Sequence, residues 1–160
     1  MITIAIKSVS FRKKIAENII EFLKMFLVIK PMQFLHNPVY YAEKLELLRK
    51  MPSNTVGSDL AKMLDRGHLK LIPRFEEHDL KHLILDYGMT SEEEIRMQAF
   101  LLGNGNYSIF CILFLISGIL LPSSWNIFYQ DYKLGQCSPS ILNLSISECM
   151  WEKTEMVKTQ

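Results

Sequence analysis

The sequence has few cysteines, and their spacing does not suit a cross-linked or zinc-binding scaffold. Its 160 residues include three cysteines, none of them in a Cys-x-x-Cys pair. An odd number of widely spaced thiols predicts neither a disulfide framework nor a zinc knuckle. We therefore expect Cys111, Cys137 and Cys149 to be reduced and buried, as in an intracellular protein.

The chain also has little net charge. Eighteen basic and 17 acidic side chains leave a formal charge of +1. No basic patch with interleaved aromatic residues occurs, so we expect no nucleic-acid partner. Hydrophobic residues make up 49% of the sequence, and a chain of this length can bury them around one core. We predict a single domain over residues 1–160.

Apolar residues recur at helical spacing through most of the chain, and Gly or Pro interrupts the pattern. The fold class that this predicts is all-α, a single-domain helical bundle. One predicted helix ends at Arg66 before Gly67, with Ser53 or Asn54 as its N-cap. Further helices are predicted over 39–50, over 76–87, and from Thr90 or Ser91 to Gly103.

The N-terminal part, residues 1–36, has some character of a targeting segment. Basic residues precede an apolar run, but Glu17 and Glu21 interrupt that run and no small-residue cleavage site follows, so a signal peptide is not expected. The pattern predicts an amphipathic helix from Phe11 to Ile29. We favour core packing over membrane-surface contact for its apolar side, which consists of Ile15, Ile19, Phe22, Phe26 and Ile29.

The segment from Ser108 to Leu121 is the most apolar part of the sequence, and uncharged residues continue to Gln130. A membrane-spanning helix needs about 20 such residues, and this run ends earlier, at Pro122. Three interpretations stay open. A buried central helix is favoured, followed by the wall of a lipid-binding cavity and then by a transmembrane span.

The most informative motif is His78-Asp79-Leu80-Lys81-His82, followed after eleven residues by Glu94. On a helix, two histidines at i and i+4 stand one turn apart, so both imidazoles can bind one metal ion. Imidazole and carboxylate ligands suit Zn²⁺, and equally Fe²⁺ and Mn²⁺. A zinc-protease activity is not favoured, because Asp79 replaces the glutamate that acts as general base in His-Glu-x-x-His.

Two alternatives are open for Glu94. It can return from a second, antiparallel helix as a metal ligand, because the predicted connection between the helices is short. It can instead belong to a capping box, since Ser91 and Thr90 each begin an Ser/Thr-x-x-Glu pattern. Asp86 projects on the face of the histidines and is a spare ligand, or an acceptor for an imidazole N–H.

The His-Asp-x-x-His-(eleven residues)-Glu motif resembles the signature of the Coq4 family of ubiquinone-biosynthesis proteins. Three further segments are similar to family patterns, over roughly residues 45 to 158. Residues 1–36 match the family poorly. The similar segments are the Pro-x-x-Thr-x-Gly pattern of Pro52 to Gly57, the Tyr132-Lys133-Leu134-Gly135 segment and the Trp151-Glu152 pair.

The resemblance implies an enzyme, a metal-dependent lyase that removes the ring carboxyl of a polyprenyl benzoate oxidatively and replaces it with hydroxyl. A divalent metal, zinc first and iron or manganese next, would be held by His78, Asp79, His82 and Glu94. A polyprenylated aromatic lipid would be the ligand. Residues expected to line its prenyl tail are Met97, Phe100, Phe114 and Gly118.

The resemblance also implies an alternative without turnover. The protein would then be a lipid-binding scaffold that organises other quinone-biosynthesis enzymes at a membrane surface, as a monomer or a homodimer. The expected location is cytoplasmic, peripheral to the inner membrane face. In a eukaryote it would be the matrix side of the mitochondrial inner membrane.

Overall fold

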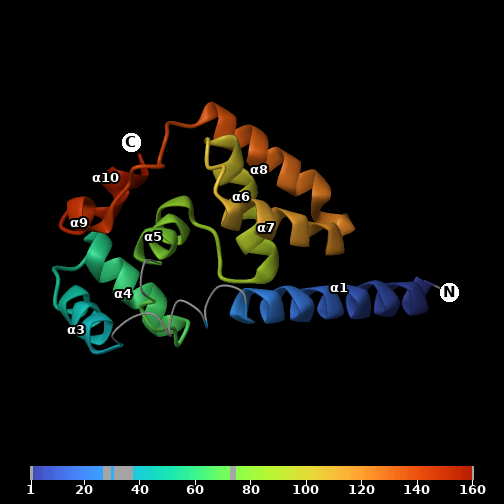
Figure 1. Cartoon of the computed structure of the whole chain (residues 1–160), viewed down its shortest axis with the longest axis horizontal. Helices are drawn as coiled ribbons and strands as arrows, with labels where there is room; N and C mark the ends of the chain where they lie inside the picture. The colour runs from blue at the N-terminus through green and yellow to red at the C-terminus, as the bar shows by residue number, and fades with distance from the viewer. Residues whose placement is uncertain (1, 27–29, 31–37, 73–74, 160) are drawn as a thin grey trace. The chain divides into compact units, whose positions relative to one another are not determined.

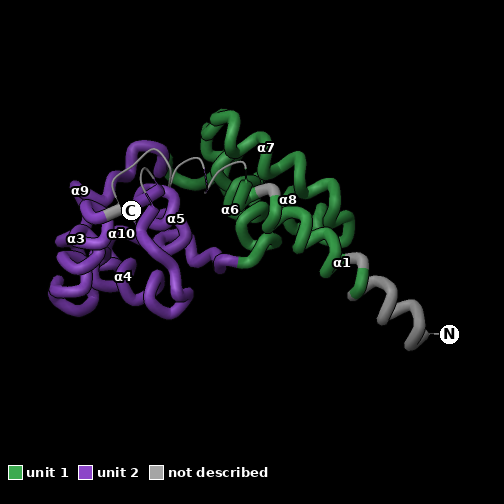
Figure 2. The backbone as a smooth tube through the Cα atoms, turned by 60° about the horizontal axis from the view of Figure 1, so that its bottom comes forward, with its two compact units in different colours: residues 1–28, 90–140 green, residues 29–89, 141–160 purple. Residues whose placement is uncertain are grey.

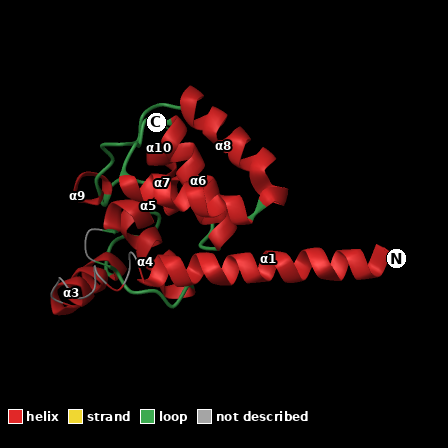
Figure 3. Cartoon of the chain, turned by 45° about the vertical axis from the view of Figure 1, so that its right-hand side comes forward, coloured by secondary structure: helices red, strands yellow, loops and turns green. Residues whose placement is uncertain are grey.

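The computed structural model of the chain describes residues 2–26, 30, 38–72 and 75–159. Within these ranges helices and loops account for the whole backbone, and no β-strand occurs (Figure 3). The prediction of an all-α fold is confirmed. Two compact units make up the chain: residues 1–28 with 90–140 form unit 1, and residues 29–89 with 141–160 form unit 2 (Figure 2).

Unit 2 contains five helices among its described residues, α3 (Pro38–Arg49), α4 (Val56–Arg66), α5 (Glu76–Leu85), α9 (Ile146–Cys149) and α10 (Thr154–Lys158) (Figure 1). The helix predicted over 39–50 corresponds to α3. Apolar side chains at helical spacing on α3, α4 and α5 meet in one core. Its fully buried members include Leu48, Val56, Leu60, Leu64 and Leu80.

Helix α4 begins with a threonine cap. The Thr55 hydroxyl accepts a hydrogen bond from the backbone N–H of Ser58 at 3.4 Å and donates to the carbonyl of Pro52 at 2.7 Å. The predicted caps Ser53 and Asn54 were therefore wrong by one or two residues. Asn54 instead adopts a left-handed conformation, with φ of 66°, which lets the chain turn into the helix.

The C-terminal segment of unit 2 pairs with the start of α4 through its backbone. The N–H groups of Val56 and Gly57 donate to the carbonyls of Glu152 and Met150, each at 3.0 Å. A Cβ on Gly57 would lie 3.2 Å from the Met150 carbonyl oxygen and 2.2 Å from the Met51 sulfur. Gly57 therefore allows the close approach, which gives the Pro-x-x-Thr-x-Gly pattern a structural reason.

Unit 1 contains helices α1 (Ile2–Lys24), α6 (Ser91–Gly103), α7 (Ile109–Ser117) and α8 (Trp125–Cys137). Two short 3-10 helices, η2 (Gly118–Leu120) and η3 (Pro122–Ser124), turn the chain between α7 and α8. Helix α6 packs against α1, α7 and α8 (Figure 1). The core between them is formed by Ala16, Ile20, Ile95, Ala99, Leu121 and Phe128.

Helices α6 and α8 touch backbone to backbone through two glycines. A Cβ on Gly135 would lie 2.0 Å from the carbonyl oxygen of Phe100, and one on Gly103 would lie 2.0 Å from that of Tyr132. Below 3.0 Å a backbone atom has to move. The crossing therefore requires glycine on both helices, and the Tyr-Lys-Leu-Gly segment supplies one of them.

Polar contacts fix the same helices. Arg96 of α6 holds the buried Asp131 of α8 with two hydrogen bonds, of 2.8 and 3.3 Å. Lys13 of α1 pairs with Glu92 of α6, which also accepts from Ser124 at 2.5 Å. The Lys13 ammonium, with the Ser124 hydroxyl, lowers the pKa of the Glu92 carboxyl. These charges orient α6 between its neighbours.

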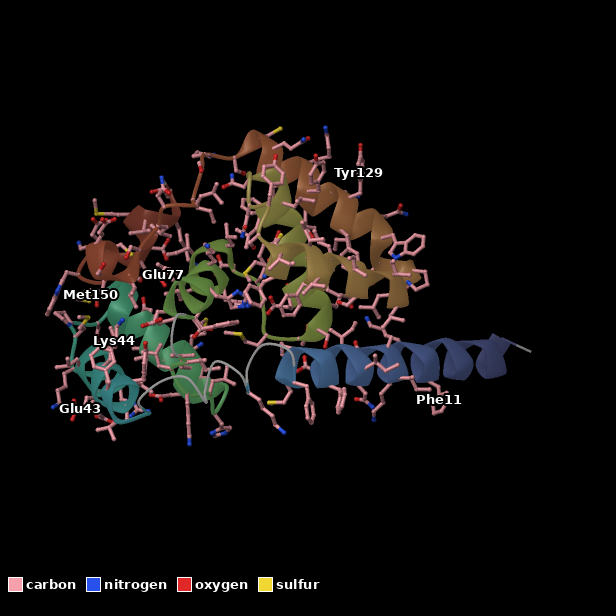
Figure 4. All side chains as sticks on the ribbon, viewed as in Figure 1. Phe11, Glu43, Lys44, Glu77, Tyr129 and Met150 are labelled. Atoms are coloured by element: carbon pink, nitrogen blue, oxygen red, sulfur yellow. The ribbon has the colours of Figure 1, made fainter. Side chains whose placement is uncertain are left out.

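The outer side of α1 differs from the prediction. The helix begins before Phe11, and residues 27–29 at the predicted end lie outside the described residues. Ala16 and Ile20 are buried against α6 and α8. Core packing was predicted for Ile15, Ile19, Phe22 and Phe26, and this prediction was wrong, because all four are exposed. In Figure 4, Phe11 likewise points away from the other helices of unit 1.

The favoured interpretation of the apolar segment was also wrong. Helix α7 is not a buried central helix, since only Cys111 and Phe114 of its nine residues are buried. Among the described residues no single helix is long and apolar enough to cross a membrane. The two stretches Ile109–Leu120 and Pro122–Cys137 meet that criterion only together, and they are bent by 108°.

Replacing Gly135 with alanine is expected to destabilise the protein by about 3 kcal/mol or more, because the new methyl group overlaps a backbone carbonyl. Chemical denaturation followed by circular dichroism measures the change. Leu134→Ala serves as the control, since its side chain is 56% exposed and its loss should cost much less. Equal stability of the two variants would contradict the close crossing.

Candidate metal site

Helix α5 carries the His-Asp-x-x-His motif. Its first turn holds Glu76, Glu77 and Asp79, where negative charge is favourable beside the positive end of the helix dipole. The helix ends at Leu85, two residues earlier than predicted. Asp86 follows in the left-handed conformation, with φ of 56° and ψ of 29°, so the turn is made by Asp86 before Gly88 is reached.

The two histidines of the motif converge. The Nε2 atoms of His78 and His82 lie 3.2 Å apart, and the ring centroids are 4.9 Å apart in an edge-to-face arrangement. Two Zn–N bonds of about 2.0–2.1 Å at the tetrahedral angle place their nitrogens about 3.3 Å apart. The imidazole pair therefore fits a zinc ion, and its spacing is also suitable for iron or manganese.

The turn after α5 orients the second of these rings. His82 is 1% exposed, and its Nδ1 atom lies 3.1 Å from the carbonyl oxygen of Tyr87. A carbonyl can only accept, so Nδ1 carries the hydrogen and donates it. In the neutral ring Nε2 then keeps its lone pair, which is directed at His78. A backbone carbonyl that fixes a ligand's tautomer is a recurrent feature of metal sites.

The two aspartates of the motif region have different surroundings. Asp79 is buried, and its backbone N–H donates to the carbonyl of Phe75 in the first turn of α5. Asp86 was predicted as a spare ligand or an imidazole acceptor. Its carboxylate instead pairs with Lys158 at 2.5 Å, and its side chain is 75% exposed. The acceptor of the His82 imidazole hydrogen is the backbone carbonyl of Tyr87. Every residue has such a carbonyl, so side-chain chemistry could not predict this acceptor.

Glu94 lies in unit 1, at the end of the first turn of α6. The Thr90 hydroxyl caps this helix by accepting a hydrogen bond from the N–H of Glu93. The glutamate of a capping box would therefore be Glu93 and not Glu94. Glu94 is 3% exposed, and its carboxylate accepts a hydrogen bond from the Gln98 side chain at 2.9 Å. The capping alternative is thereby removed. The meeting of Glu94 with the histidines of unit 2 stays a prediction.

The residues predicted to line a prenyl tail all lie inside unit 1. Met97 and Phe100 of α6, Phe114 of α7 and Gly118 of η2 are buried. A Cβ on Gly118 would lie 3.1 Å from Ile95 and 3.3 Å from Phe128, so Gly118 belongs to a packed helix contact. Contact of these four residues with a lipid stays a prediction.

Metal binding should change the tautomer of one histidine only. Without metal, the neutral pair needs one hydrogen between the two Nε2 atoms, and His78 supplies it because His82 is protonated at Nδ1. With Zn²⁺ bound, His78 must release that hydrogen, so its proton moves to Nδ1. Nitrogen-15 NMR of the imidazoles measures both rings. A change of tautomer at His82, with no change of tautomer at His78, would contradict this assignment.

Comparisons with known proteins bear on the fold. No family model matches the chain, and no curated protein matches it either. Among solved structures, the chain is similar to the crystal structure of a candidate ubiquinone biosynthesis protein from Nostoc punctiforme PCC 73102. The TM-score is 0.59 at 16% sequence identity, over 90% of this chain and 79% of that one. The two proteins therefore share their fold.

Proposed function

We propose that the protein binds a divalent metal ion and acts on a polyprenylated aromatic intermediate of ubiquinone biosynthesis. The observation that carries this proposal is the pair of Nε2 atoms 3.2 Å apart on α5. Its support is chemical, since a buried imidazole with a fixed tautomer is already prepared to act as a ligand. The shared fold with a candidate ubiquinone biosynthesis protein gives independent support.

Oxygen ligands complete the proposed site. Glu94 is the first candidate, because the short connection from Asp86 to Thr90 predicts that the next helix returns antiparallel to the first. Its carboxylate is already oriented by Gln98, which reduces the entropy that metal binding would cost. Asp79 is the second candidate, at the next position after His78. Two nitrogen and two oxygen ligands suit zinc, iron or manganese.

The proposed reaction is the oxidative removal of the ring carboxyl and its replacement by hydroxyl. When bound, a divalent ion supplies a positive charge that holds a carboxylate and a phenolate together. The reaction also consumes an external oxidant, because carbon dioxide leaves and the ring carbon gains oxygen. The chain's own part is to bind and orient the ring through the ion, while apolar residues of α6 and α7 hold the prenyl tail.

A lipid-binding scaffold without turnover is the second candidate. It is favoured by the exposed apolar residues of α1 and α7. Such residues suit contact with a membrane or a partner enzyme, and catalysis does not require them. In this case the metal would hold the polar head of the intermediate. Partner enzymes would then carry out the chemistry at the membrane surface.

Replacing either motif histidine should remove metal binding. We expect His78→Ala and His82→Ala each to lower the affinity for Zn²⁺ at least about a hundredfold, since losing a mere supporting hydrogen bond costs about 10–100-fold. Isothermal titration with Zn²⁺, and separately with Mn²⁺, measures the affinity. His68→Asn is the control, because His68 is exposed and left-handed. Wild-type affinity in either motif variant would refute the site.

Turnover separates the two candidates. Metal-loaded protein is given a polyprenyl hydroxybenzoate in air, and release of carbon dioxide is measured by mass spectrometry. If the protein is an enzyme, Glu94→Gln at saturating metal should lower the rate of carbon dioxide release at least about tenfold, because the neutral amide removes a negative charge next to the ion. Glu93→Gln is the matched neighbour and should keep its rate. Absence of carbon dioxide with tight binding of the lipid would favour the scaffold.

A further inference from the structure

Helix α7 and the 3-10 turn after it expose an unusual amount of apolar surface. The side chains involved are between 41% and 68% exposed, although each is a large aliphatic residue. We call this set the α7 surface, and it lies within unit 1. Its members are Ile109, Ile112, Leu113, Ile116, Ile119 and Leu120.

The members of the α7 surface that belong to α7 lie on one face of that helix. At 100° per residue, Ile109, Ile112, Leu113 and Ile116 fall within about 100° of arc. Cys111 and Phe114 project to the opposite side and are buried against the rest of unit 1. The inner side of the helix is thus packed in the core of unit 1, while its outer side is apolar and exposed. The outer residues therefore do not contribute to the core.

The electrostatic character of this region points to hydrocarbon as its partner. No Asp, Glu, Lys, Arg or His occurs from Met97 to Gln130. Protein interfaces of useful size have a polar rim and about one hydrogen bond per 100–200 Å². A segment without any charged residue has few groups that could form such a polar rim. The hydrocarbon interior of a lipid layer offers no polar partners, so contact with it requires no polar rim.

Aromatic residues stand at both ends of the α7 surface. Tyr107 precedes the N-cap of α7 and is 75% exposed. Trp125 begins α8, is 52% exposed, and donates its indole N–H to the carbonyl of Gly118 at 2.9 Å. Tyr and Trp prefer the boundary between lipid headgroups and hydrocarbon, because they combine an apolar ring with a polar group.

The size of the element limits how deeply it can enter. Nine helical residues extend about 14 Å, which is about half of a bilayer's hydrocarbon thickness of about 30 Å. The bend of 108° between the stretches Ile109–Leu120 and Pro122–Cys137 turns the chain back afterwards. This shape suits insertion into the nearer lipid layer only.

We propose that the α7 surface inserts into one leaflet of a lipid membrane, with Trp125 at the headgroup boundary. The inference deepens the proposed function, on which it rests, by naming the surface through which a membrane-embedded prenyl substrate would be reached. Insertion is driven by apolar burial, so it requires neither bound metal nor anionic lipid.

The protein has two tryptophans, one in each unit, and they provide an internal control. Full-length Trp151→Phe retains Trp125, and Trp125→Phe retains Trp151, which is 63% exposed in unit 2. Phosphatidylcholine vesicles should shift the emission of Trp125 to shorter wavelength, and brominated lipid should quench it. Trp151 should change little. A response from Trp151 alone, or from neither tryptophan, would overturn the proposal.

Charge substitutions test the surface directly. Ile112→Glu combined with Ile116→Glu should weaken vesicle binding at least about tenfold, because two carboxylates would have to enter hydrocarbon. The matched control is Tyr40→Glu with Leu47→Glu, two residues of α3 that are 57% and 63% exposed. Anionic lipid or added salt should change wild-type binding less than about twofold.

Two outcomes would contradict the inference even if vesicles bind. The first is unchanged binding in the α7 double variant. The second is a wild-type dimer in sedimentation velocity that this variant dissociates, because a second copy would then cover the surface. The Zn²⁺ affinity of the same variant distinguishes a failure of the membrane surface from a failure of the metal site. Retained Zn²⁺ affinity with unchanged vesicle binding would overturn the membrane surface alone and leave the metal site intact.

Discussion

The orientation of the His82 ring depends on the left-handed turn that ends α5. Asp86 adopts this conformation, and the next residue, Tyr87, brings its carbonyl to 3.1 Å from Nδ1 of His82. The ring is buried, so this hydrogen bond is protected from competing water. It leaves Nε2 as the acceptor that faces His78. The proposed metal chemistry begins with this one backbone contact, because it prepares the ligand before any ion binds.

Helix α6 is held by contacts on several sides within unit 1. Backbone contact through Gly103 and Gly135, the Arg96–Asp131 pair and the Lys13–Glu92 pair fix its position. Glu94 therefore stands on a rigid element, with one carboxylate oxygen bound by Gln98. Functional groups on such elements are placed more accurately than groups on loops. The exposed face of neighbouring α7 lies outside this constrained core, so it is available for a partner.

Much of the fold could be predicted from periodicity, because helix formation follows the local spacing of apolar residues. The start of α6 at Thr90 or Ser91 and its end at Gly103 are examples. Burial could not be predicted so well. Phe22 and Ile116 have core-like side chains, and whether a partner covers them depends on tertiary packing. For the site, the i and i+4 spacing predicted the imidazole pair, whereas the Tyr87 carbonyl has no signature in side-chain chemistry.

The coordination of a bound ion is measured most directly by X-ray absorption spectroscopy of the full-length protein loaded with one equivalent of Zn²⁺. If His78 and His82 hold the ion, the spectrum shows two imidazole nitrogens with carboxylate oxygens, all at about 2.0–2.2 Å. The three cysteines offer a different ligand set, and a sulfur scatterer at about 2.3 Å would show that they bind the ion instead. That result, or a spectrum without imidazole scattering, would contradict metal binding by the histidine pair of α5.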